Sequence, residues 1–178
     1  MIYLFRIISD EDKEFYRDLV IDGTDTFLDF HQTLQKNLDF DPSQLASFFI
    51  TNEMWEKKQE ITLIDMMQDP EHSMVTMDKV TLEEYITDEI QHMIYVFDFF
   101  SERAFFIELL EKSDQTSARD TPFIGDAKGD APPQLMLDLL MDEPDADLDD
   151  FDPEEGQDDL RLDDLDPDMF DTGMPEDF

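Results

Sequence analysis

The sequence contains no cysteine, which excludes disulfides, thiolate metal sites and cysteine nucleophiles. Glycine is also scarce, with only 5 scattered along the 178 residues. None of the common phosphate-binding, dinucleotide-binding, serine-hydrolase or zinc-protease motifs occurs. We therefore predict no cofactor, and the sequence offers no positive signal for an enzyme.

Basic residues are the next shortage. The chain has 12 Lys and Arg against 48 Asp and Glu, a formal net charge of -36. A field of this sign repels phosphate backbones and anionic lipid surfaces, so we expect no direct nucleic-acid binding and no membrane partner. The same field attracts cations and basic proteins and keeps the chain in solution.

Long hydrophobic runs are absent as well. No apolar run approaches the roughly 20 residues that span a bilayer. The first residues lack the basic region, the long apolar region and the cleavage site of a signal peptide. We therefore expect a cytoplasmic protein.

The N-terminal third of the chain predicts a hairpin followed by a helix. Residues 1–9 and 15–21 are rich in β-branched, aromatic and aliphatic side chains, and the charged segment 10–13 between them predicts a turn. A helix is then predicted over residues 25–38, because apolar side chains recur there at helical spacing. These side chains are Phe27, Phe30, His31, Leu34 and Leu38.

Further strands are predicted at 47–51, 60–64, 93–99 and 103–110. A capping box that starts at Thr81 predicts a short second helix. Together these elements predict an α+β fold with a largely antiparallel sheet of four to five strands, one main helix and a short second helix.

The composition changes after residue 112. Residues 1–112 hold 25 acidic and 9 basic side chains, whereas residues 113–178 hold 23 acidic and only 3 basic ones. We predict a folded domain over 1–112, a linker rich in small and polar residues over 113–133, and an acidic, low-complexity tail over 134–178. The tail has too little apolar content to offset the entropy of ordering, so it is predicted to be disordered.

Several segments resemble the plasmid pRiA4b ORF-3-like family, a group of small bacterial α+β domains with no established activity. FYRDLVI, TFLDFHQTLQKNLDFDPSQLASFFI, IYVFDF, FFIEL and GDAPPQ carry the resemblance, at residues 15–21, 26–50, 94–99, 105–109 and 129–134. The resemblance implies the fold, and it implies little about function.

The chain departs from the family pattern where the family has histidines. Gln44-Leu45-Ala46 replaces an H-L-H motif, and the segment from Phe100 to Phe105 replaces G-D-x-W-x-H. If relatives use those histidines for chemistry, this chain lacks them. His31 and Asp98 remain at matching positions.

His31 and Asp98 are therefore the candidates for chemistry. His31 lies on the apolar stripe of the predicted helix and has no His or Cys partner at i+3 or i+4, which favours a core histidine over a ligand or general base. Asp98 interrupts an aromatic strand, and we interpret it as a turn cap or as the ion-pair partner of Arg103. The alternative is a metal-dependent or hydrolase-like enzyme that uses His31 and Asp98.

The acidic tail predicts no dedicated calcium site. From Asp145 the acids match EF-hand positions 1, 3 and 5, but Asp150 stands where glycine is required and Gly156 where the bidentate glutamate belongs. No other metal site is predicted.

The apolar residues of the tail favour a docking role, because solvation alone does not need them. Acidic-hydrophobic alternation of this kind is typical of segments that bind a basic or grooved partner protein. We predict a non-enzymatic protein-interaction module with a docking or polyanion-like tail. Its predicted partner-binding residues are Leu135, Leu137, Leu139, Leu140, Phe151, Leu165 and Phe170.

Overall fold

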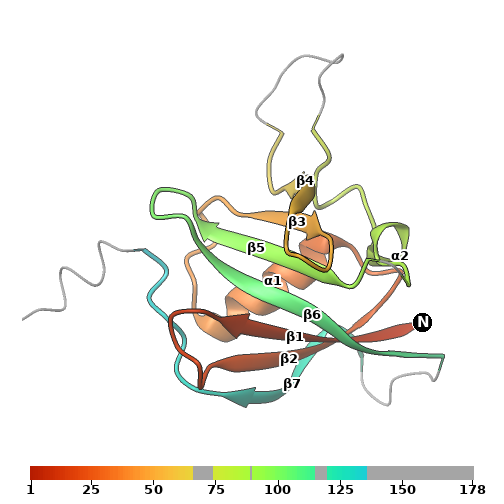
Figure 1. Cartoon of the computed structure of the whole chain (residues 1–178), viewed down its shortest axis with the longest axis horizontal. Helices are drawn as coiled ribbons and strands as arrows, with labels where there is room; N and C mark the ends of the chain where they lie inside the picture. The colour runs from red at the N-terminus through yellow and green to blue at the C-terminus, as the bar shows by residue number, and fades with distance from the viewer. Residues whose placement is uncertain (66–73, 89, 115–119, 136–178) are drawn as a thin grey trace, which may run out of the picture. The chain divides into compact units, whose positions relative to one another are not determined.

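A single antiparallel sheet organises the chain. The computed structural model describes residues 1–65, 74–88, 90–114 and 120–135. In chain order, the strands and helices of these residues are β1 (Ile2–Ser9), β2 (Tyr16–Asp22), α1 (Phe27–Leu38), β3 (Ser47–Thr51), β4 (Lys57–Thr62), α2 (Leu82–Tyr85), β5 (His92–Asp98), β6 (Arg103–Ser113) and β7 (Phe123–Lys128). The strands form one sheet in the order β4-β3-β5-β6-β1-β2-β7, and each pair of neighbouring strands is antiparallel (Figure 1).

The predicted fold class is confirmed and the predicted strand number is wrong. The structure is α+β with a mostly antiparallel sheet and two helices among the described residues, but the sheet has seven strands instead of four to five. β4 begins earlier than predicted, because its charged residues pair with β3 from Lys57 onward. Charged side chains suit an edge strand, where they oppose pairing with other chains.

The helix α1 covers one face of the sheet. Thr26 caps it, since the Thr26 hydroxyl accepts from the Asp29 N–H and the Asp29 carboxylate accepts from the Thr26 N–H. At the other end Asp39 adopts a left-handed conformation, with φ of 57°, which stops the helix. The predicted helix over 25–38 is therefore confirmed, with its first turn starting at Phe27.

The core lies between α1 and the sheet and is unusually aromatic. Alternate residues of each strand point to α1: in β1 the side chains of Tyr3, Phe5 and Ile7 are at most 3% exposed. Phe105 of β6 stacks on Phe15 at a ring-centroid distance of 5.2 Å and is fully buried. Aromatic pairs of this kind contribute beyond their buried area.

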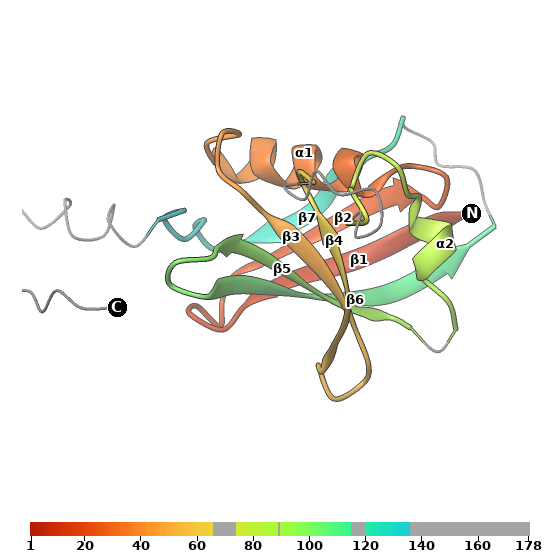
Figure 2. The same cartoon turned by 90° about the horizontal axis from the view of Figure 1, so that it is seen from above.

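The opposite face of the sheet is not covered by either described helix. Figure 2 shows α1 on one side of the sheet and the β3–β4 turn projecting from the other. The short α2 packs at the start of α1, where the Leu82 N–H donates to the Asp25 carbonyl. The face opposite α1, called the outer face below, is thus open to a partner over the described residues.

The segment 113–133, predicted as a linker, contributes β7 to the sheet. β7 pairs with β2, and Arg17 of β2 donates to the carbonyls of Lys128 and Gly129 at 2.8 and 3.0 Å. Further on, the Gln134 amide side chain exchanges hydrogen bonds with the Asp41 backbone at 2.7 and 3.2 Å. β7 lacks a clear apolar alternation along its sequence. It is placed by its pairing with β2, whose residues lie more than a hundred positions earlier in the chain.

By its internal contacts the chain divides into two units, Met1–Asp142 and Glu143–Phe178. All described strands and helices lie in the first unit. Among the described residues, no helix has both the length and the apolar character needed to cross a membrane.

Candidate binding site at the β5–β6 turn

The turn between β5 and β6, residues 99–102, is held by Asp98. The Asp98 carboxylate accepts from the backbone N–H groups of Phe100 and Ser101 at 3.0 and 3.2 Å. Glu102 completes the turn in a left-handed conformation, with φ of 55°. Asp98 itself is 4% exposed. The geometry agrees with the turn-cap interpretation of this residue.

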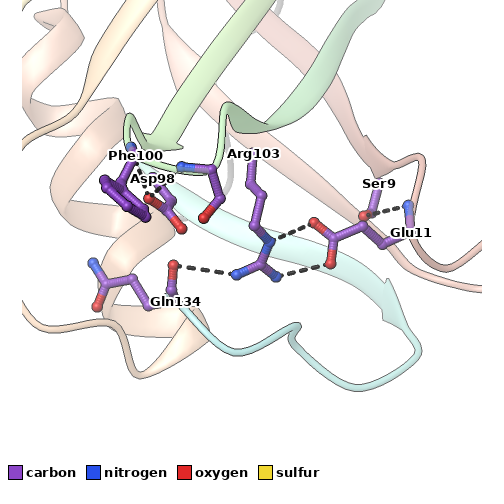
Figure 3. A network of polar contacts seen from close by, with 7 residues as sticks. Ser9, Glu11, Asp98, Phe100, Arg103 and Gln134 are labelled. Atoms are coloured by element: carbon purple, nitrogen blue, oxygen red, sulfur yellow. Dashed lines mark hydrogen bonds and ion pairs between the residues drawn. The ribbon is translucent and has the colours of Figure 1, made fainter. Parts of the chain in front are cut away.

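Arg103 follows the turn and pairs with Glu11, so of the two interpretations given for Asp98, turn cap or ion-pair partner of Arg103, the second is wrong. The guanidinium Nε and Nη2 donate to the two Glu11 carboxylate oxygens, each at 2.8 Å (Figure 3). The hydrogen-bonded Glu11 raises the pKa of Arg103, with a smaller contribution in the same direction from Asp98. A parallel, two-bond pair of this type fixes geometry as well as charge.

The Arg103–Glu11 pair joins three separate segments of the chain. The Glu11 backbone N–H donates to Ser9 Oγ at 3.1 Å, which orders the turn between β1 and β2. Arg103 Nη1 donates to the Gln134 carbonyl at 3.4 Å (Figure 3). Because the Arg103 side chain is only 6% exposed, its charge depends on Glu11 for compensation.

The outer face next to this turn contains two adjoining hollows. The first, of about 360 Å³, lies at the turn end and is lined mainly by Asp10, Glu11, Glu102, Arg103, Ala104 and Phe106. The second, of about 370 Å³, shares Glu102, Ala104 and Phe106 and adds Phe49, Lys57, Ile94, Val96 and Phe99. We call the two hollows together the outer groove.

Two aromatic side chains stand in solvent at the turn. Phe99 is 47% exposed and lines the outer groove, whereas Phe100 is 96% exposed. Large apolar side chains that cluster on an open surface are a common mark of interaction sites. The aromatic strand that precedes Phe99 and Phe100 in the sequence gave no indication that both side chains are exposed.

Trp55 borders the same face from the β3–β4 turn. Its ring meets Phe106 edge to face at 5.0 Å between centroids and lies 4.8 Å from His92. The backbone of Trp55 is left-handed, with φ of 62°, a conformation that costs a non-glycine residue about 1–2 kcal/mol. The packing on Phe106 places the indole at the border of the groove.

The structure does not bring His31 and Asp98 together. His31 is 2% exposed, and its Nδ1 shares a hydrogen bond of 2.9 Å with the Tyr95 hydroxyl. Asp98 follows Tyr95 by three residues, about 10 Å further along the strand. The core interpretation of His31 therefore fits its surroundings. Among the described residues, no group of three or more His, Asp and Glu side chains is placed to hold a metal ion.

The buried His31 predicts acid sensitivity. Burial lowers the pKa of His31 from 6.5 to about 4, so the unfolded chain binds a proton in that interval that the folded chain does not. The free energy of unfolding should thus fall as the pH is lowered, and His31 should account for about 2 kcal/mol between pH 7 and pH 5. His31→Asn keeps a polar partner for Tyr95. In denaturant titrations, its free energy of unfolding should fall by about 2 kcal/mol less between pH 7 and pH 5 than that of the unaltered protein. Equal pH dependence in both proteins would contradict the assignment.

Most of the predicted partner-binding residues lie beyond the described chain. Leu135 is half-buried next to Gln134. Leu137, Leu139, Leu140, Phe151, Leu165 and Phe170 fall outside the described residues. The site residues that sequence reasoning missed are Glu11 and Gln134, which reach Arg103 from distant segments and leave no local signal.

The fold and the site together define a class: a small α+β domain with one face of its sheet covered by a helix and the other face grooved and open. Within this class, the chain belongs to the plasmid pRiA4b ORF-3-like family, whose model matches residues 2–172. The resemblance found in the sequence is confirmed.

A solved structure shares the fold. It is a protein of unknown function, MM3350, from Methanosarcina mazei Go1, with a TM-score of 0.63 and 20% sequence identity. The match covers 79% of this chain and 82% of that one. No curated protein sequence matches this chain significantly.

Proposed function

We propose that the protein is a non-enzymatic interaction module that binds a basic partner protein. The observation that carries this proposal is the outer groove: an apolar depression on an uncovered sheet face, with Asp10 and Glu102 at one end beside the Glu11–Arg103 pair. Apolar surface combined with a charged rim is the usual composition of a protein interface. No arrangement of His31 with Asp98 supports a catalytic alternative.

The charge of the chain selects the partner. Residues 1–135 hold 29 acidic and 11 basic side chains, and residues 136–178 hold 19 acidic and 1 basic. Such a field accelerates the encounter with a basic protein and disfavours an acidic one. In this proposal the tail aspartates supply long-range attraction in the cytoplasm, and tail leucines such as Leu137 and Leu139 add apolar contacts on the partner.

A short, fluorescently labelled peptide of lysine, leucine and serine tests the proposal. Its association rate with the full chain and with a truncated chain, Met1–Asp142, is measured by stopped flow at low and at physiological salt. Residues 1–142 are chosen because truncation at residue 112 would remove β7. The full chain should bind about tenfold faster at low salt, and the difference should shrink as the Debye length falls to about 8 Å at 0.15 M salt.

A peptide with glutamate in place of lysine is the matched control and should not bind. Failure of the lysine peptide to bind the full chain at low salt would overturn the proposed function. Equal association rates for the full and truncated chains at low salt would show that the tail has no part in the proposed function.

A further inference from the structure

The outer groove owes its depth to one small residue. Ala104 of β6 lies opposite Val96 of β5 in the sheet, and both line the groove beside the larger rings of Phe99 and Phe106. A methyl group among three bulkier side chains leaves a depression of about 370 Å³. This volume lies at the lower end of the range for ligand pockets and suits a single large side chain.

The floor of the groove is apolar and exposes little surface to water. Ile94 and Val96 belong to the outer face, yet they are only 7% and 4% exposed. Phe49 and Phe106 from the neighbouring strands border them. An apolar side chain placed here would lose its contact with water without displacing a charged group from the floor.

The two ends of the groove differ in charge. At the β3–β4 end, the Lys57 ammonium lies 4.3 Å from the centre of the Phe49 ring. At the turn end, Asp10 and Glu102 line the first hollow beside the Glu11–Arg103 pair, so acidic side chains outnumber basic ones there. A bound segment with a lysine or arginine beside its apolar anchor is therefore favoured in one orientation, with its cation at the turn end.

The turn end is also held rigidly before any partner arrives. Asp98 caps the turn, and the two hydrogen bonds between Arg103 and Glu11 fix it to the turn between β1 and β2. A site whose side chains are already ordered loses less conformational entropy on binding.

We propose that the outer groove binds a basic segment of a partner protein by one large apolar side chain, which fills the hollow between Phe49 and Phe99, with a neighbouring lysine or arginine against Glu102 and Asp10. This inference rests on the proposed function and names the recognition element within it. The occupant is a partner protein, because the negative charge of the chain disfavours both its own acidic tail and a second copy in an acid-lined groove.

Two peptides of equal charge test the inference on the full chain. Both consist of lysine and serine, and one has a central phenylalanine where the other has serine. Binding is followed by anisotropy and by the fluorescence of Trp55, the sole tryptophan, which packs on the groove residue Phe106. Burial of one phenylalanine should tighten binding about 10- to 100-fold relative to the serine peptide.

Two adjacent phenylalanines provide a matched pair of variants. Phe99→Ala removes a wall of the groove and should weaken the phenylalanine peptide about tenfold while leaving the serine peptide unchanged. Phe100→Ala alters a side chain that is 96% exposed and does not line the groove, so it should change neither affinity. Thermal unfolding confirms that both variants fold, which is expected because neither side chain is in the core.

The outcomes separate the two proposals. Equal binding of both peptides overturns the groove inference and leaves the proposed function standing, whereas no binding of either peptide overturns both. Equal losses of affinity for the phenylalanine peptide in Phe99→Ala and Phe100→Ala would place the contact on the turn and overturn the groove inference. Tighter binding by Met1–Asp142 than by the full chain would identify the tail as the occupant, and a dimer that Phe99→Ala dissociates would identify a second copy; either result overturns a partner protein as occupant.

Discussion

Replacement of Glu11 by glutamine should lower the free energy of unfolding by about 3 kcal/mol. Glutamine keeps the shape of the side chain and removes its charge, which leaves the Arg103 guanidinium buried, at 6% exposure, without its carboxylate. Removal of one partner destabilises the fold by more than the intact pair stabilises it, because the free energy of desolvating the Arg103 guanidinium is then no longer offset by a carboxylate. Urea titration of the variant and of the unaltered protein measures the loss.

Glu14→Gln is the matched control for Glu11→Gln. Glu14 lies in the same turn between β1 and β2 and forms an ion pair with Lys128, but the two side chains are 72% and 55% exposed. Exposed pairs contribute between about 0 and 1 kcal/mol, so Glu14→Gln should change stability by less than about 1 kcal/mol. If the two variants lost similar amounts, the buried pair would not be what holds the turns together.

Replacement of Gly129 by alanine should destabilise the protein by about 3 kcal/mol. Gly129 has φ of +75°, which alanine adopts only with strain, and an added Cβ would lie 2.9 Å from the Phe15 Cα. The Phe15 backbone cannot move aside easily, because Phe15 is a fully buried core residue. Thermal unfolding and urea titration should both show the loss.

Gly125→Ala, in the strand that Gly129 follows, provides the comparison. A Cβ at Gly125 would meet its nearest neighbours at 3.7 and 3.8 Å, which is ordinary contact, and the backbone there is not left-handed. We expect a change of less than about 1 kcal/mol in either direction. Similar stability for Gly129→Ala and Gly125→Ala would contradict the close packing of residues 120–135 on the domain.

Both stability predictions bear on the proposed binding site, because they test how firmly distant segments hold the turns beside it. Glu11 holds the turn between β1 and β2 to Arg103, which also bonds to the Gln134 carbonyl, and Gly129 ties the segment after the last strand to Arg17. In the native protein the turn is ordered on folding. If the turn were loosened, its ordering would take place on binding, and the lost conformational entropy would weaken the affinity.

Local patterns were sufficient for the helix and for most strands. The stripe of apolar residues predicted α1 within two residues, because helical spacing is a property of nearby residues. The strands β1, β2, β3, β5 and β6 followed in the same way from runs of β-branched and aromatic side chains. The acidic character of the chain, from which the proposed basic partner is argued, is likewise a property of composition alone.

What the tertiary structure alone decided involves residues far apart in the chain. β7 has few apolar side chains, yet it pairs with β2, and Arg17 of β2 bonds to the carbonyls of Lys128 and Gly129 at its end. Arg103 lies opposite Asp98 in the hairpin, but Glu11 reaches it from another turn with better geometry.

The sequence by itself determined the fold class, the main helix and the charge, since each depends on spacing or composition that can be counted along the chain. Only the tertiary structure decided the seventh strand, the partner of Arg103 and the outer groove. These depend on which side chains the sheet places next to one another, and a depression over Ala104 exists only because three strands bring larger residues around it.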